Sequence, residues 1–406
     1  PGAHWWIGVG LRQPVLTETS SARIRCPGYR TVQLAGTSPG GYVLDSSPGI
    51  YRNVLLLDFK SLYPSIIRSF LIDPCGMWAP GDDPVSGFGG ATFARDGALL
   101  PSIVSDLGAR RDQAKREQNQ PLSQAIKIIM NSFYGVLGAS GCRFVDPKLT
   151  SSITRRGHEV IQRSQTFIED SGYRVIYGDT DSLFVLLPDD LDEPAAIEKG
   201  NTLAEALNQW WKQTLALEYR VESHLELEFE HLFLRFLMPT VRGTDVGTKK
   251  RYAGMVRKND GFELIFKGLE VVRTDWTEIA RTFQRELYRR VFENLPYEDY
   301  VQEIDQRLLN GEFDEQLVYR KRLRRPIAEY AGTGPPHVQA ARKLDQPTRW
   351  VRYVITATGP EPVEHGPHRP DYEHYRQRQL APVADAILHF LGTSYDSLTS
   401  SQLEIF

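Results

Sequence analysis

Carboxylates stand beside apolar segments at two distant places in the sequence. Asp58 lies near the end of the apolar run NVLLLDF, and YGDTDS (177–182) places Asp179 and Asp181 between RVI and LFVLL. Isolated charge is costly to bury, so something must neutralise these side chains. If Asp58 and Asp181 meet in one sheet, they form a paired carboxylate site suited to a hard divalent cation such as Mg²⁺. The alternative is two unrelated aspartates in turns.

Polar and cationic side chains recur at helical spacing in two neighbouring segments. Arg111 and Lys115 are four residues apart, and Lys127 and Asn131 repeat that spacing. Each pair therefore shares one helix face. An antiparallel helix pair can direct these groups at one triphosphate, because Arg supplies forked donors and Lys a compact charge. An ordinary solvated basic face is the alternative.

The elements that must position these groups alternate between β and α patterns. A buried strand is expected to end at Asp58, followed by a helix that starts near Pro64. YRVIYGDTDSLFVLL predicts a β-hairpin whose turn carries the two aspartates. Between strand and hairpin, three segments have helical patterns: PSIVSDLGARRDQAKREQ, LSQAIKIIMNSFYGVLG and SSITRRGHEVIQRSQTFIED.

The second half of the chain contains a further helix, a strand and a second hairpin in its predicted pattern. AAIEKGNTLAEALNQWWKQTL predicts a helix, and LELEFE predicts a strand with Glu226, Glu228 and Glu230 on one face. We interpret this as a solvated sheet face, and the alternative is a structural role or the binding of a third metal ion. Residues 249–268 predict a hairpin that turns at Asn259-Asp260-Gly261. Residues 38–51 read as turns, and beyond about residue 270 helices are expected to dominate.

Composition is that of a globular protein, with 406 residues, 41% hydrophobic and 24% charged. The net charge of −3 does not indicate a particular kind of partner. Residues 319–352, however, contain nine Lys or Arg and only two acidic residues, Glu329 and Asp345, which gives this segment a net charge of +7. Such a run suits a phosphate backbone. The three cysteines have no metal-ligand spacing, and no membrane-length apolar run or signal peptide is found, so a reducing cytoplasm is expected.

Four short motifs occur in a fixed order: DFKSLYPSII (58–67), KIIMNSFYG (127–135), YGDTDS (177–182) and KKRY (249–252). Together they resemble the motifs of the family B DNA polymerases. The resemblance covers about residues 38 to 406 and points to a bacterial branch of that family, through segments such as SPGGYVLDSSPG, KGLEVVRTDW and YRKRLRRP. Residues 1–38 match nothing and stay unassigned, either non-native sequence or the remnant of an N-terminal region.

The resemblance implies a role for each motif residue. Asp58 and Asp181 would bridge two Mg²⁺ ions, for which Mn²⁺ can substitute, with the backbone carbonyl of Phe59 as a further metal ligand and Asp179 as a third catalytic candidate. Tyr63 would exclude a ribonucleotide 2′-hydroxyl. The implied nucleotide-binding residues are Ser61, Leu62, Tyr63, Arg111, Lys115, Lys127 and Asn131. The implied DNA-binding residues are Tyr134, Gly135, Lys249, Lys250, Arg251, Tyr252, Lys267, Arg324 and Arg325.

The resemblance also implies the fold, an α+β right-hand polymerase with an antiparallel-sheet palm, helical fingers and a mainly helical thumb. The expected parts are 39–95 and 146–268 for the palm, 96–145 for the fingers and 269–406 for the thumb. At the C-terminus, QLEIF is similar to the peptide that binds the bacterial sliding clamp, through Gln402, Leu403, Ile405 and Phe406.

The expected function is template-directed DNA synthesis, which adds dNTPs to a primer 3′-hydroxyl and releases pyrophosphate, in replication restart or DNA repair. Expected partners are primer–template DNA, dNTP and the sliding clamp, for a monomer in the bacterial cytoplasm, at the nucleoid, without a membrane contact. Only 57 residues precede Asp58, so the chain is expected to be a fragment without a proofreading exonuclease. Two alternatives stay open: a clamp-tethered primer–template binder without catalysis, and a ribonucleotide polymerase or reverse transcriptase.

Overall fold

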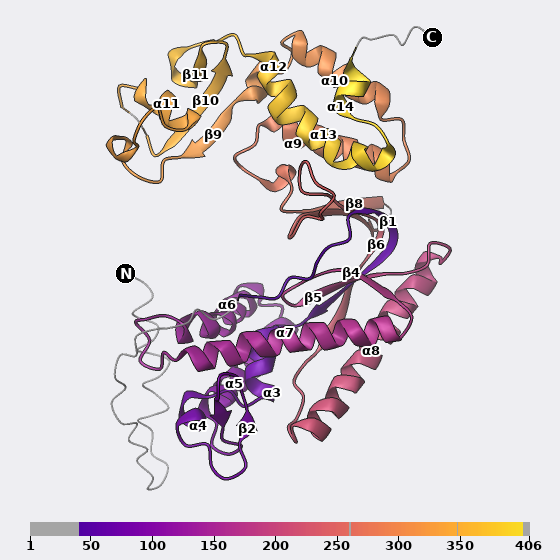
Figure 1. The fold of residues 1–406 in the computed structure, drawn as a ribbon, viewed down its shortest axis with the longest axis vertical. Helices are drawn as coiled ribbons and strands as arrows, with labels where there is room; N and C mark the ends of the chain where they lie inside the picture. Colours follow the sequence, from indigo (N-terminus) through magenta and orange to yellow (C-terminus); the bar gives the residue numbers. More distant parts are fainter. Residues whose placement is uncertain (1–39, 260, 347, 401–406) are drawn as a thin grey trace. The chain divides into compact units, whose positions relative to one another are not determined.

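The computed structural model describes residues 40–259, 261–346 and 348–400 and divides into two compact units (Figure 1). The first unit comprises, among these residues, 40–44, Leu56–Val185 and Ile197–Glu230. The second comprises Asp45–Leu55, Leu186–Ala196 and the rest of the described chain from His231. Strands β1 (Gly49–Phe59) and β6 (Leu227–Met238) contribute residues to both units.

The main sheet has six strands in the order β4-β5-β1-β6-β7-β8. Its other strands are β4 (Arg174–Asp179), β5 (Ser182–Leu186), β7 (Tyr252–Lys258) and β8 (Gly261–Lys267). The apolar residues Val54–Leu57 of β1 are all buried. A run buried on both faces is typical of an interior strand, and β1 indeed lies between β5 and β6. The predicted strand at Asp58 and the hairpin at 177–182 are confirmed.

The segment 40–44 runs beside the β4–β5 hairpin, although the sequence predicted only turns there. The Leu44 N–H donates to the Gly178 carbonyl at 2.9 Å, and the Thr180 N–H donates to the Tyr42 carbonyl at 2.7 Å. A Cβ on Gly41 would lie 2.3 Å from Thr180 Oγ1, so only glycine allows this approach. The segment thereby fixes the turn that carries Asp179 and Asp181.

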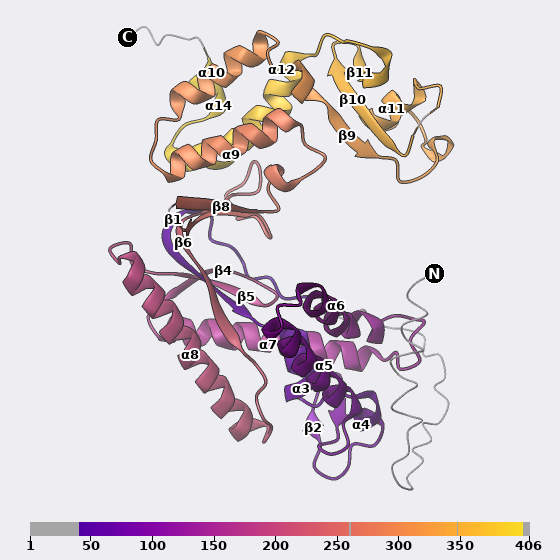
Figure 2. The ribbon, with the colours of Figure 1, turned by 180° about the vertical axis from the view of Figure 1, so that it is seen from behind.

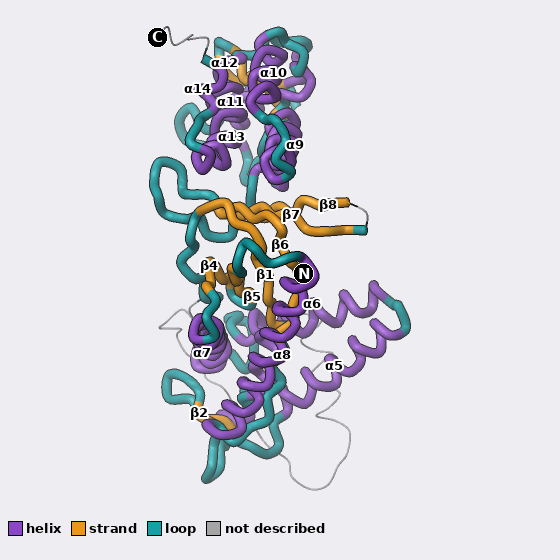
Figure 3. Tube along the Cα trace, turned by 90° about the vertical axis from the view of Figure 1, so that its right-hand side faces the viewer, coloured by secondary structure: helices purple, strands orange, loops and turns teal. Residues whose placement is uncertain are grey.

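The helices of the first unit are α3 (Leu62–Ser69), α4 (Pro74–Trp78), α5 (Leu99–Arg116), α6 (Gln120–Leu137), α7 (Pro147–Asp170) and most of α8 (Glu193–Glu218), with the short strands β2 (Val85–Ser86) and β3 (Thr92–Phe93). The four helices predicted between residues 99 and 218 are thus confirmed. Helices α5 and α6 form a helical hairpin (Figure 3). Side-chain caps from Asn119 and Asp146 begin α6 and α7.

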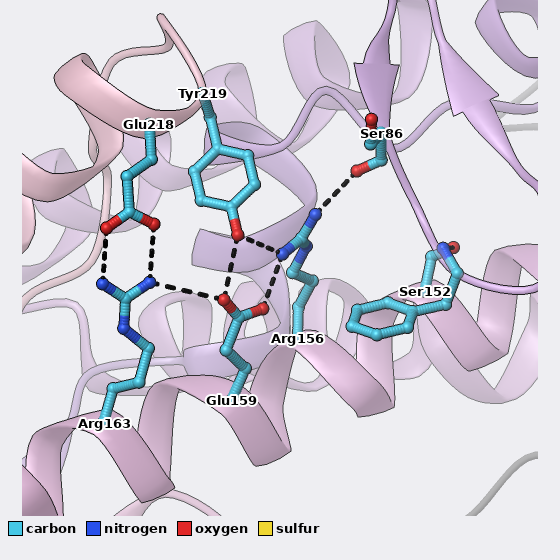
Figure 4. A network of polar contacts seen from close by, with 8 residues as sticks. Ser86, Ser152, Arg156, Glu159, Arg163, Glu218 and Tyr219 are labelled. Atoms are coloured by element: carbon cyan, nitrogen blue, oxygen red, sulfur yellow. Dashed lines mark hydrogen bonds and ion pairs between the residues drawn. The ribbon is translucent and has the colours of Figure 1, made fainter.

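A buried ionic network ties α7 to the end of α8 (Figure 4). Arg156, whose side chain is 6% exposed, pairs with Glu159 at 2.5 Å and donates to the Ser86 carbonyl at 2.7 Å. Arg163, also on α7, extends the network to the end of α8, because its guanidinium binds both carboxylate oxygens of Glu218 at 2.7 and 2.8 Å. Breaking such a pair leaves an uncompensated charge, so the network holds α7 in one position.

The second unit holds a helical cluster and a second sheet (Figures 1 and 2). Its helices are α9 (Glu278–Phe292), α10 (Glu298–Leu309), α11 (Pro336–Arg342), α12 (Tyr372–Tyr375), α13 (Ala381–Leu388) and α14 (Tyr395–Thr399). Its single-turn elements are η1 (Glu270–Val272), η2 (Asp314–Leu317), η3 (Ile327–Glu329), η4 (Val363–His365), η5 (Arg376–Leu380) and η6 (His389–Leu391). Among the residues described, no helix has the length and apolarity needed to cross a membrane.

The expectation that helices dominate beyond residue 270 overlooked a three-stranded sheet. Strands β9 (Tyr319–Arg322), β10 (Trp350–Thr356) and β11 (Gly359–Pro362) pair in the order β11-β10-β9. One face carries Tyr319, Val351 and Tyr353, which are buried in the core of this unit. The Arg and Lys residues of YRKR obscured the alternation that marks a half-buried strand.

The hairpin predicted over 249–268 places KKRY on its first strand, with Lys250 and Tyr252 on one face, and this part of the prediction is wrong. Strand β7 begins only at Tyr252, and Lys250 has a φ of 63° in the left-handed region. Lys250 and Tyr252 are therefore not alternate residues of one strand. A Cβ on Gly268 would lie 2.2 Å from the Lys250 carbonyl oxygen, so glycine is required where the two segments meet. The hairpin itself is confirmed, with Lys258 paired to Gly261.

A buried carboxylate organises the start of β7. Glu270 is 1% exposed, and its carboxylate accepts from Arg251, from Arg242 at 3.3 Å and from Gln284 Nε2 at 3.0 Å. Gln284 in turn accepts from the Val271 N–H at 2.7 Å. The carboxylate is thus compensated from several sides, as a buried charge must be.

We predict that Glu270→Ala destabilises the second unit by about 3–5 kcal/mol, because Arg251 loses the partner of its buried end. Denaturant unfolding of the full chain measures this. The matched control is Glu303→Ala, which removes a carboxylate that is 59% exposed and paired with Arg307 on α10. The control should cost less than about 1 kcal/mol. Equal costs for the two variants would contradict the assignment of Glu270 as an organising charge.

Candidate active site

The structure brings Asp58 and Asp181 together. Strand β5 is the neighbour of β1, and the Phe59 N–H donates to the Asp181 carbonyl at 2.7 Å. Both aspartates are half-buried. The end of one strand and the turn of a hairpin, more than a hundred residues apart in sequence, thus place two carboxylates at one point of the sheet.

The electrostatics of this pair favour a bound cation. Burial raises the pKa of Asp58 to about 7, with further contributions from the negative charges of Asp181 and Glu230, and Lys127 opposes them. Burial also raises the pKa of Asp181, the negative charges of Asp179 and Glu230 raise it further, and Lys127 lowers it. One lysine therefore does not compensate the carboxylates that meet here, and added positive charge would stabilise their ionised form.

The turn of the hairpin holds the third aspartate. Thr180 has a φ of 60°, and the Asp181 N–H donates to the Asp179 carbonyl at 2.6 Å. The Thr180 hydroxyl donates to Asp179 Oδ1 at 3.0 Å. The tight turn thus keeps the Asp179 charge close to Asp181 while its carboxylate is engaged by the neighbouring hydroxyl.

Strand β6 adds glutamates whose proximity the sequence did not reveal. Lys60 Nζ pairs with Glu226 and Glu228, each at 3.1 Å. Glu230 is exposed, as expected of a solvated face, yet it raises the pKa of both Asp58 and Asp181. The alternation in LELEFE already placed the three glutamates on one face, but the adjacency of β6 to β1 was needed to bring that face to the aspartates.

A cavity of about 650 Å³ opens beside Asp58. Its lining includes Arg111 and Lys115 from α5 and Lys127 from α6, the cations predicted to converge. Ser61 also lines it, with its hydroxyl accepting from Arg111 Nη1 at 3.3 Å, and residues of α8 and β6 form the other wall. Asn131 lies one turn further along α6, exposed and outside this lining.

Tyr63 lies on α3 against α6 and α7. Its ring centroid is 5.0 Å from that of Tyr134, and a Cβ on Gly157 would already lie 3.3 Å from the Tyr63 ring. Burial, then Tyr134 and Asp181, raise the pKa of Tyr63 to about 12, so the phenol stays protonated. Packing on two sides fixes the ring near the aspartates.

Gly135, which was predicted to contact DNA, has open space beside it, with no atom within 4 Å of an added Cβ.

The backbone before Tyr63 is unusual. Ser61 has φ 52° and ψ 55°, a left-handed conformation that is uncommon for a residue other than glycine. The Leu62 side chain is only 3% exposed and packs in the core. Leu62 can therefore face a nucleotide only through its backbone.

The remaining predicted DNA-binding residues belong to the second unit, where several are already engaged. Lys249 pairs with Asp45 at 3.5 Å, and Arg251 with Glu270. Tyr252 is 9% exposed and packs on Phe236, with ring centroids 5.4 Å apart.

Three more predicted DNA-binding residues are exposed to solvent. Lys267 lies opposite Tyr252 on β8, and Arg324 follows β9. The Arg325 guanidinium lies 4.5 Å from the centroid of the Tyr330 ring. The clamp-binding residues 402–406 lie outside the described residues.

The donor set at Asp58 suits a hard cation. Within the ranges that the structure describes, no group of three or more His, Cys, Asp or Glu side chains is arranged as a metal site. Asp58 and Asp181 offer two carboxylates, and backbone carbonyls such as that of Phe59 are further oxygen donors. Mg²⁺ commonly uses one or two carboxylates and completes its shell with water and substrate phosphates, so these residues fit it.

Comparison with known proteins places this geometry in a family. The family model described as DNA polymerase family B matches residues 12–80 and 101–359. The chain is 52% identical to DNA polymerase II of Escherichia coli over 386 residues, which cover 91% of the chain and 49% of that protein. It is 30% identical to a DNA polymerase of a Thermococcus species, covering 89% of the chain and 48% of the relative.

The fold is also similar to a solved structure. The family B DNA polymerase of the archaeon Pyrobaculum calidifontis superposes with a TM-score of 0.62 at 25% identity, covering 90% of this chain and 49% of that one. The chain thus spans about half the length of the relatives it matches.

These findings confirm the resemblance read from the motifs, and the identity to DNA polymerase II of Escherichia coli confirms the bacterial branch of the family. They also correct one point, because the family model already matches from residue 12, inside the leader that the sequence left unassigned. The chain belongs to DNA polymerase family B.

Proposed function

We propose that this chain carries the synthetic centre of a DNA-directed DNA polymerase, which extends a primer 3′-hydroxyl with dNTPs and releases pyrophosphate. The observation that carries the proposal is the meeting of Asp58 and Asp181 beside a cavity lined by Arg111, Lys115 and Lys127. Phosphoryl transfer is catalysed mostly by positioning the reactants and by neutralising developing charge. The aspartates could position metal ions, and the cations of the cavity could neutralise phosphate charge.

Two Mg²⁺ ions, with Mn²⁺ as a substitute, are the proposed cofactors. Asp58 and Asp181 would hold them, with the Phe59 carbonyl as a further ligand. Bound there, the ions would lower the pKa of the primer hydroxyl and stabilise the charge of the departing pyrophosphate. The raised pKa of Asp58 supports this role, because it reflects burial of the carboxylate and, after that, neighbouring negative charge that the chain itself leaves undercompensated.

The chain's own residues would bind and orient the nucleotide. Arg111, Lys115 and Lys127 would hold the triphosphate in the cavity by charge-assisted hydrogen bonds, with Asn131 on the same helix as Lys127. Arg111 would exchange its present contact with Ser61 for a phosphate. Tyr63, packed against Tyr134, would form the rigid surface under the sugar.

We assign the parts of a right-hand polymerase as the sequence suggested. Residues 39–95 and 146–268 would form the palm, and 96–145, with the α5–α6 hairpin, the fingers. Residues 269–406 would form the thumb, which includes the β9–β11 sheet as well as helices. Tyr134, Gly135, Lys249, Lys250, Arg251, Tyr252, Lys267, Arg324 and Arg325 remain the proposed DNA contacts.

The proposed biological setting combines the bacterial relative with the expectations from the sequence. Primer–template DNA and dNTP are the proposed partners of a monomeric enzyme in a bacterial cytoplasm, at the nucleoid, acting in DNA repair or replication restart. Residues 402–406 would tether it to the sliding clamp through Gln402, Leu403, Ile405 and Phe406.

The first test is the loss of extension on removal of one carboxylate charge. Asp181→Asn and Asp58→Asn should each lower primer extension in Mg²⁺ at least about a hundredfold, the usual cost of losing one group that stabilises transition-state charge. Asp170→Asn, at the exposed end of α7, is the matched control and should keep normal activity. Binding of primer–template, measured in parallel, should persist in all variants.

Two outcomes would decide against this proposal. Equal extension by Asp181→Asn and the unchanged chain would overturn the metal-site assignment. Binding of primer–template without extension by any protein, the unchanged chain included, would favour the binding-only alternative.

The second test concerns the triphosphate. Lys127→Ala and Arg111→Ala should each lower kcat/KM for dNTP about 10- to 100-fold, because each removes a charged hydrogen bond to phosphate. Arg116→Ala is the matched control, since Arg116 follows Lys115 on α5 but does not line the cavity. An equal decrease for Arg116→Ala would indicate a general charge effect and not a site.

The third test concerns the sugar. Tyr63→Ala should raise the kcat/KM of ribonucleotides relative to deoxynucleotides by at least about tenfold, because the ring that would meet a 2′-hydroxyl is removed. Tyr63→Phe keeps the ring and should keep the selectivity. Steady-state kinetics with both nucleotide types measure the ratio. An unchanged ratio in Tyr63→Ala would exclude the ring as the selectivity element.

A further inference from the structure

One exposed face of the β9–β10 ladder is entirely cationic and aromatic. Arg320 is paired with Arg352 across the ladder, and Arg322 is paired with Trp350. These four side chains are exposed, whereas Tyr319, Val351 and Tyr353 on the opposite face are buried. We call the four residues Arg320, Arg322, Trp350 and Arg352 the β9–β10 face.

The arrangement costs the fold free energy. Like charges directly opposite one another on neighbouring strands destabilise a sheet. Arg320 and Arg352 occupy such positions, and Arg322 lies on the same face two residues from Arg320. In the part of the chain that the structure describes, none of these three guanidinium groups forms an ion pair with a carboxylate. An anion bound between these guanidinium groups would relieve their mutual repulsion, so the face should bind anions favourably.

Trp350 adds a stacking surface to the charges. It is 43% exposed, and the Arg320 guanidinium lies 4.7 Å from the centroid of its ring. An exposed tryptophan among unpaired arginines offers a flat apolar surface beside phosphate-binding groups. Unpaired nucleobases bind such surfaces by stacking, independently of sequence, whereas the bases of a duplex are already stacked on one another.

We infer that the β9–β10 face binds single-stranded DNA, with the three arginines on the phosphate backbone and Trp350 stacked on a base. The inference rests on the proposed function only for the choice of DNA as the polyanion, since a template must be single-stranded ahead of synthesis. The sequence indicates this basic segment, but the residues predicted from it to bind DNA are Arg324 and Arg325. The strand register shows that Arg320, Arg322 and Arg352 share the exposed face instead.

The test is equilibrium binding of a fluorescein-labelled oligothymidylate to the full chain, in EDTA and at several salt concentrations. Arg320→Gln and Arg352→Gln should each reduce the slope of log affinity against log salt by about 0.7, and the double variant by about 1.4. Trp350→Ala should weaken binding about tenfold, and Trp350→Phe less. Binding of a blunt duplex of equal charge should change little in Trp350→Ala.

The matched control is Arg285→Gln, which removes an exposed arginine of the same unit from α9. It should leave the slope for oligothymidylate unchanged. Equal slopes for Arg285→Gln and Arg320→Gln would overturn the inference. So would arginine effects without any effect of Trp350→Ala, since that result describes a surface for any polyanion.

The binding test and the synthesis test can fail separately. Binding is measured in EDTA without dNTP, so it does not require the metal site or catalysis. A chain that binds oligothymidylate through this face but extends no primer would retain the inference and reject the proposed function. If the chain extends primers normally but oligothymidylate binds all variants with the same affinity and salt dependence, the inference is rejected and the proposed function is retained.

Discussion

The architecture of the first unit depends on holding mutually repelling carboxylates close together. Burial raises the pKa of Asp58 and of Asp181, and nearby negative charges raise both further: Asp181 and Glu230 act on Asp58, and Asp179 and Glu230 act on Asp181. Nothing in the electrostatics of these groups favours their meeting. They meet because the buried run of β1 and the β4–β5 hairpin are fixed by apolar packing and backbone hydrogen bonds, including that from the Phe59 N–H to the Asp181 carbonyl. The apolar core thus supports an arrangement of charges that a bound cation would stabilise.

The residues around the carboxylates show how tightly that position is specified. Gly41 allows the segment 40–44 to close over Thr180, and Gly157 leaves room for the Tyr63 ring. Helix α7, which carries Gly157, is anchored by the Arg156 network, so the surface behind Tyr63 cannot easily recede (Figure 4). The glycines allow the close approach of neighbouring segments to Thr180 and Tyr63, and the Arg156 network keeps α7 from shifting. Precise positioning of this kind is what phosphoryl transfer requires of a protein.

Much of this arrangement could be predicted from the sequence, and the failures have physical causes. The elements that carry Asp58 and Asp181 were predictable because a buried apolar run and a hairpin pattern are local signals, whereas the meeting of the two aspartates was implied by the resemblance of the four motifs. The proximity of Glu230 was not, because it depends on β6 being the neighbour of β1, which is a long-range fact. KKRY misled because Lys250 has a left-handed φ where its carbonyl oxygen approaches Gly268, a long-range contact that the local pattern does not show. Strand β9 was missed because its exposed residues are arginines, whose charge hides the alternation of a half-buried strand.

The net charge of −3 hides a separation of charge that is more informative than the total. At Asp58 the chain gathers carboxylates with one opposing lysine, and on the β9–β10 face it gathers arginines that pair with no carboxylate among the residues described. Each cluster is unfavourable on its own, and each becomes favourable only with a ligand of opposite sign. A surface under no such demand would intersperse the charges, as it does along α9 and α10, where Arg289 and Arg307 pair with glutamates of their own helices. Uncompensated charge of one sign is therefore the feature on which both ligand proposals rest: divalent cations at the acidic cluster and phosphates at the basic one.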